Sequence, residues 1–377
     1  MLKSKHVLCP VCGEVFTEAC YGNHKRRERL LLKHSVLQDF FVDPLSGDTS
    51  TVYTLDSGKM DIQDGMPERI RVKVGDGKPE EFSRCCPKCS SLTIMPRYWG
   101  KVPSFVVCVA AMPGEGKTCL YTAMSTNANL SVLASAGYPW RLTTSQMETG
   151  MNMTAAHTPL DSIGATKVFH IRSRNDLDEN RPPLANILFR DSPGELFEKG
   201  KGSLDNPFYK FLQKHDAYPG PDALIFLHSA EKPDDNLVHV YATLRDSIPH
   251  WPHTAVVVTH ADKIRKWTQL SGDSTQVSLM DDHTFPVCPP GIAGSGYYAP
   301  NLVRRRRQLQ DSIVRSRYYS MFNKDFPITG EHTRCFLVKS CYQDAEGKLQ
   351  YDHPINIMDP VIWLLNDCLL QPREEKL

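Results

Sequence analysis

The stretch that most constrains the fold is FVVCVAAMPGEGKTCL, residues 105–120, in which an apolar run leads directly into a glycine-rich turn. The turn fits the pattern G-x-x-x-x-G-K-[ST] except at its first position, which is Ala111. In that pattern backbone N–H groups surround phosphate oxygens, the lysine reaches the terminal phosphates and the hydroxyl holds Mg²⁺. Alanine is tolerated at that position if its φ is negative. We therefore expect nucleotide contacts from Pro113, Gly114, Glu115, Gly116, Lys117, Thr118 and Cys119.

Short apolar runs alternate with helical stretches from Phe105 onward. The runs contain Val, Ile, Phe and Leu with little polar alternation, which is typical of parallel strands buried on both faces. This pattern predicts an α/β protein with the P-loop NTPase fold, a mostly parallel central sheet flanked by helices. We expect strands at 105–111, 166–171, 186–191, 223–228, 254–260 and 334–340, helices at 116–125, 207–215, 236–248, 302–322 and 358–370, and a long irregular loop at 268–300.

Two later strands end in polar residues that suit a nucleotide site. NILFRDSPGE ends its apolar run at Asp191, and Gly194 follows three residues later. In this D-x-x-G pattern the carboxylate orders Mg²⁺ and its water while the glycine N–H senses the terminal phosphate; an ordinary Pro-Gly turn is the alternative. TAVVVTHADK places Asp262 just after another strand. A carboxylate there can accept from both the N1–H and the exocyclic amine of guanine, a donor pair that adenine lacks.

The chain resembles the P-loop GTPases, a TRAFAC-like class, in three motifs: AMPGEGKT, DSPGE and THAD. The motifs come in the order that this family uses, and each follows an expected strand. The resemblance covers residues 103–370 and implies GTP and Mg²⁺ as ligands. Thr259 and His260 depart from the family's N-K-x-D pattern: His260 replaces a lysine whose stem packs on the base. Its imidazole can stack instead, and Lys263 can partly compensate. The loop after the last strand is implied to contact the base, through Ser340.

The same resemblance implies a threonine that completes Mg²⁺ coordination between the first helix and Asp191. Thr158 is the first choice and Thr154 the second, with an ordinary loop threonine as the alternative. Glu195 falls where signalling GTPases place the residue that orients the attacking water; a capping or first-turn helix residue is the alternative. An anion beside the triphosphate predicts slow hydrolysis. The expected catalytic set is Lys117, Thr118, Asp191 and Glu195.

Two C-P-x-C knuckles, Cys9/Cys12 and Cys86/Cys89, predict a four-cysteine zinc site of the zinc-ribbon kind. Their wide separation predicts an insertion or extended β structure over 43–84. A rival set joins Cys9 and Cys12 to Cys20 and His24, leaving Cys85, Cys86 and Cys89 for a second metal. We therefore divide the chain into residues 1–100, a zinc-ribbon domain with an inserted β-rich segment, and 101–377, a P-loop GTPase-like domain.

Composition limits the partners. The net charge is +1, and no apolar run approaches the roughly 20 residues that span a bilayer. The start of the chain has no apolar signal core. In a chain without a signal peptide, the twelve cysteines are better explained as metal ligands and buried thiols than as disulfides. A cytoplasmic location is therefore expected. The basic clusters 23–34 and 304–307 are interpreted as solvated faces with salt bridges; a patch for nucleic acid or an acidic partner is the alternative. A protein partner is expected; the oligomeric state stays open.

A zinc ribbon joined to a divergent GTPase domain is similar to the bacterial zinc-ribbon "double-GTPase" proteins of intracellular conflict systems. That resemblance implies nucleotide-dependent assembly in a defence-related setting. The expected function is therefore a GTP-binding protein that hydrolyses GTP slowly and acts as a switch. The alternatives are a nucleotide-binding scaffold or adaptor with weak catalysis, and an ATPase.

Overall fold

The structure is a computed structural model. It describes residues 6–23, 25–33, 40–42, 53–55, 68–89, 92, 94–124, 137–144, 166–198, 206–214, 218–232, 235–245, 247–248, 251–270, 273–278, 300–317, 332–340, 342–343, 346, 349–350 and 355–370. Within those ranges no helix has both the length and the apolar character needed to cross a membrane.

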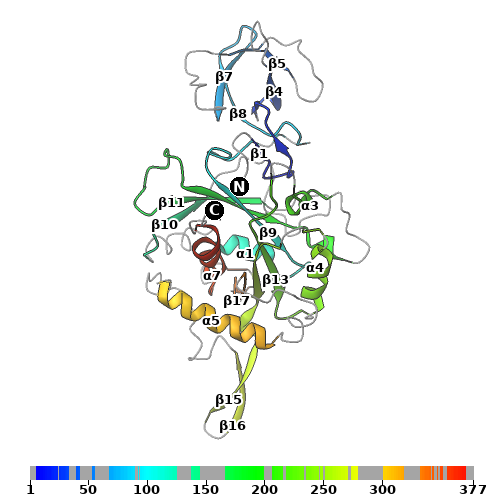
Figure 1. Ribbon diagram of the computed structural model, residues 1–377, viewed down its shortest axis with the longest axis vertical. Helices are drawn as coiled ribbons and strands as arrows, with labels where there is room; N and C mark the ends of the chain where they lie inside the picture. The colour runs from blue at the N-terminus through cyan, green and yellow to red at the C-terminus, as the bar shows by residue number, and fades with distance from the viewer. Residues whose placement is uncertain are drawn as a thin grey trace, which may run out of the picture.

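The N-terminal residues form a small hairpin and an antiparallel sheet at one end of the molecule (Figure 1). The hairpin pairs β1 with β2, and its turn contains Cys9 and Cys12. The sheet has the order β5-β4-β3-β8-β7-β6. Strand β8 pairs with β3 and ends beside Cys86. The sheet between the two knuckles therefore brings the second knuckle close to the first. The bounds are β1 (Val7–Leu8), β2 (Val15–Phe16), β3 (Cys20–Asn23), β4 (Glu28–Lys33), β5 (Phe40–Val42), β6 (Tyr53–Leu55), β7 (Arg69–Val74) and β8 (Glu80–Arg84).

The central sheet has seven strands in the order β10-β11-β12-β9-β13-β14-β17. The five strands from β12 to β17 are parallel, and β10 and β11 are antiparallel to their neighbours. The predicted α/β class with a mostly parallel sheet is therefore confirmed. The bounds are β9 (Ser104–Ala110), β10 (Trp140–Thr144), β11 (Thr166–Ser173), β12 (Ala185–Asp191), β13 (Ala223–Ser229), β14 (His253–Thr259) and β17 (Thr333–Leu337).

Two regions differ from the expectation. Strand β10 was not predicted, and it extends the sheet beyond β11. Part of the predicted irregular loop is instead an antiparallel hairpin of β15 (Arg265–Leu270) and β16 (Asp273–Ser278), which projects from the molecule (Figure 1). A further small pair, β18 (Tyr342–Gln343) and β19 (Leu349–Gln350), follows β17.

Helices cover both faces of the central sheet. Along β9, Val106, Cys108 and Ala110 belong to one core, and the alternate residues Val107 and Val109 belong to the other. The first core includes apolar residues of α3 and α4, and the second those of α1 and α7. The bounds are α1 (Lys117–Met124), α3 (Pro207–Leu212), α4 (Asp235–Arg245), α5 (Pro300–Arg317) and α7 (Asp359–Trp363), with short helical segments η3 (Gly194–Phe197), η4 (Ala261–Lys263) and η7 (Leu364–Leu369).

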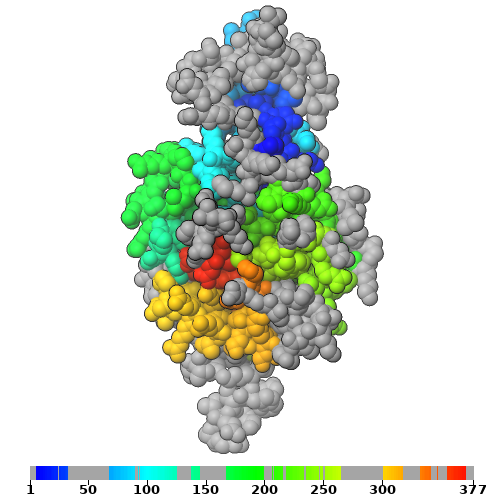
Figure 2. Space-filling view, in the orientation of Figure 1, coloured from blue at the N-terminus to red at the C-terminus, as the bar shows by residue number. Residues whose placement is uncertain are grey.

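The cysteine knuckles belong to the same core as α3. Cys9, Cys86 and Cys89 are buried in one cluster with Phe208 and Phe211. The segment after the second knuckle adds to this junction, because the indole N–H of Trp99 donates to the carbonyl of Leu8 at 2.6 Å. In the space-filling view the N-terminal residues, in blue, lie above the cyan and green segments of the central domain (Figure 2). The cysteine knuckles and the central sheet are thus packed together.

Basic residues 304–307 lie on α5, and two of them have structural partners. Arg306 is buried, and its Nε donates to Asp359 Oδ2 at 2.7 Å. Arg307 pairs with Asp367. Two of the four arginines therefore attach α5 to the C-terminal helices through salt bridges, and the buried Arg306 does not belong to the solvated face that was expected.

Candidate nucleotide and metal sites

The glycine-rich turn has the backbone that its sequence requires. Gly114 and Gly116 have φ of 77° and 88°, in the left-handed region where a Cβ is unfavourable. Ala111 is fully buried and is not among the described residues with positive φ, so alanine is accommodated at the position where the pattern has glycine. The turn lies between β9 and α1, at the point where the strand order reverses between β12 and β13. Such switch points are where open α/β sheets bind ligands.

Lys117 contacts both the turn and the loop after β12. Its Nζ donates to the carbonyl of Ala111 at 2.8 Å and to that of Met112 at 3.3 Å. Burial lowers the pKa of Lys117, and the nearby carboxylates of Asp191 and Glu195 oppose that shift. A Cβ on Gly194 would lie 2.7 Å from Pro113 N and 3.0 Å from Lys117 Nζ, so only glycine permits this approach. The structure therefore brings the first two motifs into contact.

Asp191 is a buried carboxylate at the end of β12. Burial raises its pKa to about 7, against the opposing charges of Lys117 and Arg190. Its Oδ1 has no hydrogen-bond partner among the described residues. An unpartnered buried oxygen of this kind is costly unless a ligand satisfies it, and carboxylate and hydroxyl oxygens are what Mg²⁺ prefers. Asp191 and the exposed Thr118 therefore offer oxygen donors of the kind that the expected magnesium site needs.

Glu115 makes its polar contacts within the protein. Its side chain is 1% exposed; Oε2 accepts from the backbone N–H of Ser229, and Oε1 accepts from Asn236 Nδ2 at 2.8 Å. His228 Nδ1 lies 3.6 Å from Oε2. These partners belong to β13 and α4. The side chain of Glu115 thus anchors the glycine-rich turn, residues 111–118 and here named the phosphate loop, to β13, while its backbone N–H remains part of the turn.

Thr259 connects the third motif to the first. Its hydroxyl donates to the carbonyl of Glu115 at 2.9 Å, and the residue is buried. A Cβ on Gly116 would lie 3.4 Å from the same hydroxyl oxygen. Thr259 is therefore a residue that positions the phosphate loop, a role that the base-reading motif did not suggest.

The residues after Thr259 are those expected to contact the base. His260 adopts the left-handed conformation with φ of 52°, and its Nδ1 is 2.9 Å from Ser229 Oγ. The N–H of Ala261 donates to the carbonyl of Val338 at 3.2 Å, which joins this loop to the one after β17. Asp262 and the buried Ser340 belong to these joined loops, and the Ser340 hydroxyl has no hydrogen-bond partner among the described residues.

Two lysines in this region form ion pairs. Lys339 Nζ lies 3.5 Å from Asp262 Oδ2, and Lys263 Nζ lies 4.0 Å from Glu231 Oε1. Lys339 was not among the predicted site residues, although it directly precedes Ser340. Lys232 was also missed: its Nζ would lie 3.6 Å from a Cβ on Gly114, which places a second ammonium group beside the phosphate loop.

Of the remaining predicted site residues, some lie within the described ranges of the structure and others lie outside them. Glu195 lies in the first turn of η3, directly after Gly194, and its charge acts on Lys117 and Asp191. Cys119 lies in the first turn of α1. Thr158 and its alternative Thr154 lie outside the described residues.

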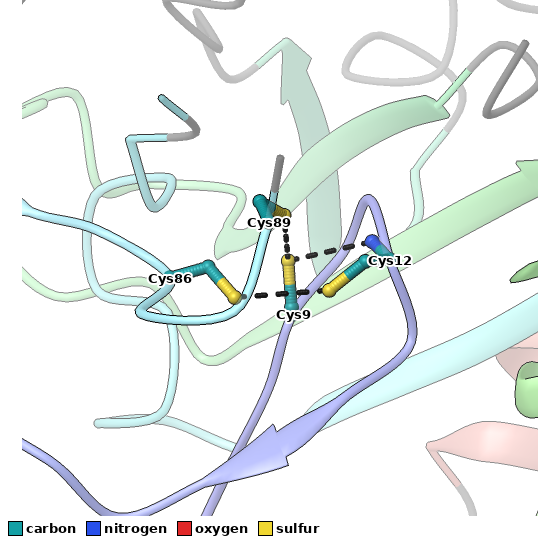
Figure 3. Close-up of side chains that lie close together, drawn as sticks. All are labelled: Cys9, Cys12, Cys86 and Cys89. Carbon is teal, nitrogen blue, oxygen red and sulfur yellow. Dashed lines mark hydrogen bonds between the residues drawn. The ribbon is translucent and has the colours of Figure 1, made fainter. Parts of the chain in front are cut away.

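Four cysteine sulfurs form a second site (Figure 3). The Sγ atoms of Cys9, Cys12, Cys86 and Cys89 all lie within 4.8 Å of one another, with Cys9 to Cys89 at 3.5 Å and Cys12 to Cys86 at 3.7 Å. A tetrahedral zinc with Zn–S bonds of about 2.3 Å requires S–S separations of about 3.8 Å. The N–H groups of Cys12 and Lys88 point to Sγ atoms, as in zinc knuckles. The donor set therefore fits zinc.

The four cysteine sulfurs that converge among the described residues are not the ligands of the rival zinc set. Cys20 lies at the start of β3 with its Sγ 3.4 Å from that of Cys85, apart from the four converging sulfurs. This pair is buried between β3 and the end of β8. His24, the fourth ligand of the rival set, lies outside the described residues.

The four-cysteine site contacts the helix that follows the Asp191 loop. A Cβ on Gly13, whose φ is 72°, would lie 3.0 Å from Lys210 Cβ and from Phe211. Lys210 also pairs with Glu14 of the first knuckle. Between the two sites lies Arg190, fully buried with its guanidinium 5.0 Å from the centre of the Phe211 ring. Burial lowers the pKa of Arg190 to about 10, opposed by Cys108, Asp191 and Cys9.

No family model matches the chain, and no curated protein matches it. Among solved structures it is similar to the G domain of the T. maritima FeoB iron transporter, with 17% identity, a TM-score of 0.21 and coverage of 42% of this chain and 74% of that one. It is also similar to the S. cerevisiae Ski7 GTPase-like domain bound to GTP, with 10% identity, a TM-score of 0.28 and coverage of 63% and 43%. Both TM-scores are low, and neither similarity carries the argument that follows.

Proposed function

We propose that the protein binds GTP with Mg²⁺ along the carboxyl edge of the central sheet and hydrolyses it slowly as a nucleotide-dependent switch. The observation that carries the proposal is the linkage of three separate motifs. Gly194 lies against the phosphate loop, Thr259 bonds to it, and the loop with Asp262 follows Thr259 directly. Parallel strands place these loops on one edge, as a nucleotide with a base end and a phosphate end requires.

Each residue has a defined task in this proposal. The turn N–H groups and Lys117 hold the phosphates and stabilise the charge that develops on them. Thr118 and Asp191 would hold Mg²⁺, which would neutralise further phosphate charge. The Gly194 N–H contacts the terminal phosphate, and Glu195 accepts a hydrogen bond from the attacking water. Asp262 accepts from the guanine base. Thr158 completes the metal site.

The zinc-binding module, residues 1–100, reports the nucleotide state in this proposal. The loop with Gly194 leads into η3 and then α3, and α3 packs against Gly13 and Glu14 of the first knuckle. A shift of the Gly194 loop on hydrolysis would therefore reach the knuckle through Phe211 and Arg190. A protein partner that contacts the module would sense that shift.

An ATPase is the second candidate, because Lys339 already faces Asp262 at 3.5 Å. If Lys339 stays paired with Asp262, the carboxylate selects guanine less well. The protein would then bind ATP as well as GTP, without a preference for either.

Nucleotide binding and turnover by the zinc-loaded full chain test the proposal. Lys117→Ala should abolish GTP hydrolysis and weaken GTP binding by about two orders of magnitude, since it removes a charge-assisted phosphate contact in a partly buried site. Lys73→Ala is the matched control, because Lys73 is an exposed lysine on β7. Equal GTP binding by the two variants would overturn the proposal, whereas binding without measurable turnover would favour the scaffold alternative.

A further inference from the structure

A polar cavity of about 430 Å³ lies where the N-terminal sheet meets the outer strands of the central sheet. Its walls include Arg84 from β8, Trp99 from the connecting segment, Thr143 from β10 and His170 from β11. Cavities for small ligands span roughly 300–1,000 Å³, so this one has room for a metabolite-sized molecule.

This cavity is far from the phosphate loop along the strands. His170 pairs with Asn186, and Asn186 pairs with Ser104, the first residue of β9. The phosphate loop begins after Ala110 at the other end of β9. A molecule in the cavity would therefore contact the amino end of the strands, and the two sites are separate.

Positive charge dominates the cavity walls. Four arginines line it, Arg69, Arg84, Arg97 and Arg172, against two glutamates, Glu68 and Glu179. Glu68 also accepts from the backbone N–H of Tyr98, and Glu179 is exposed. Arg84 and Arg172 are 6% and 2% exposed. Two of the four arginines also have acidic partners that do not line the cavity: Arg69 pairs with Glu81, and Arg172 lies 3.9 Å from Asp176.

Several of these cationic and polar groups are held in fixed positions. Arg172 donates to the carbonyls of Asp178, Glu179 and Arg181, while its buried Nε has no partner among the described residues. Arg97 lies over the Tyr98 ring, 4.9 Å from its centre. Preorganised groups of this kind bind a ligand with a smaller loss of side-chain freedom.

His170 adds a hydrogen-bonding group. Its Nδ1 lies 2.7 Å from Asn186 Oδ1, and Asn186 Nδ2 in turn donates to Tyr98 and Ser104. Because the carbonyl of Asn186 only accepts, Nδ1 carries the proton, and Nε2 remains for a ligand. Burial lowers the pKa of His170, so the ring is neutral at neutral pH and accepts a hydrogen bond at Nε2.

An apolar wall completes the cavity. Ile94, Met95 and Pro96 are buried residues that line it beside Trp99. A cavity lined by both arginines and apolar residues suits a molecule with an anionic group and an organic body.

We propose that this cavity is a second ligand site that binds a small organic phosphate. The phosphate pairs with the guanidinium groups of Arg84, Arg97 and Arg172, and a hydroxyl of the organic part donates to His170. Arginine is suited to this role because its planar fork of donors matches the oxygens of a phosphate. The site joins the zinc-binding module to the central domain, so occupancy stabilises their junction.

Isothermal titration calorimetry of the zinc-loaded full chain with ribose 5-phosphate, and with ribose as the uncharged control, tests this site. We expect one saturable site for ribose 5-phosphate and none for ribose. Arg97→Gln should weaken binding about tenfold through loss of a charge-assisted contact. Arg97 is exposed, so its replacement leaves the fold intact, which unchanged zinc content and thermal unfolding will verify.

Two further variants separate this site from the phosphate loop. Thr144→Trp places a large side chain at an exposed residue of the cavity wall and should block ribose 5-phosphate without changing any charge. Lys117→Ala should leave the titration unchanged. No binding by the wild type would overturn the proposal. So would binding that survives both cavity substitutions, or binding that Lys117→Ala abolishes.

Discussion

Glu115 and Thr259 use their polar side-chain atoms on protein partners, although both belong to motifs that we propose bind a nucleotide. Glu115 satisfies the backbone of Ser229 and the amide of Asn236, and Thr259 satisfies the carbonyl of Glu115. A loop whose N–H groups are to bind phosphate needs other contacts, on the side away from the ligand, that fix the position of its backbone. At the scale of single residues, part of each motif therefore serves to position the loop.

Thr259→Val should destabilise the protein and weaken nucleotide binding together. The substitution keeps the shape of the side chain but leaves the Glu115 carbonyl without its 2.9 Å partner, which costs about 1–3 kcal/mol at a buried site. Urea unfolding measures the first effect, and nucleotide titration the second. Thr259→Ser retains the hydroxyl and should stay close to the wild type. A valine variant with unchanged affinity would show that this bond does not position the loop.

At the scale of elements, the structure couples the zinc knuckles to α3. Most zinc ribbons are small modules that the metal holds together. Here Cys9, Cys86 and Cys89 are buried in the same core as Phe208 and Phe211 of α3, so the candidate metal site is also part of the central domain's packing. Loss of metal should therefore affect both parts of the chain.

Cys12→Ser should remove the zinc, lower the temperature of unfolding and weaken nucleotide binding, because the knuckle that supports α3 loses its shape. Metal analysis, calorimetry and nucleotide titration check the three effects. Cys20→Ser is the matched control, since Cys20 faces Cys85 outside the four-sulfur cluster. It should keep one zinc per chain. Loss of zinc from the Cys20 variant would instead favour the rival ligand set.

At the scale of the whole molecule, the central sheet was predictable because its strands are buried on both faces. All seven residues of β12 and of β13 are buried, and such runs stand out in the sequence. The knuckles were predictable from their spacing. Strand β10, WRLTT, is short and lies at the sheet edge, where propensity is a weak guide.

The contacts that individual side chains make could not be predicted from the sequence. The motif around Glu115 does not show that β13 and α4 supply partners for its carboxylate. Arg190 is similar: its position before Asp191 is visible, but its burial against Phe211 depends on where α3 packs. Lys232 and Lys339 approach the site only through the adjacency of strands far apart in sequence. Tertiary packing decides all of these.

The most direct test of the central claim exchanges one atom at the base end of the site. Asp262 is proposed to accept from the N1–H and the exocyclic amine of guanine; asparagine can instead donate to the carbonyl that xanthine has in place of that amine. Competition among GTP, ATP and xanthosine triphosphate for the wild type and Asp262→Asn provides the measurement.

We predict that the wild type prefers GTP and that Asp262→Asn prefers xanthosine triphosphate, with a change in preference of at least about tenfold. Lys117→Ala should weaken the binding of all three nucleotides without changing their order. Equal binding of GTP and ATP by the wild type, with no change in Asp262→Asn, would contradict the account.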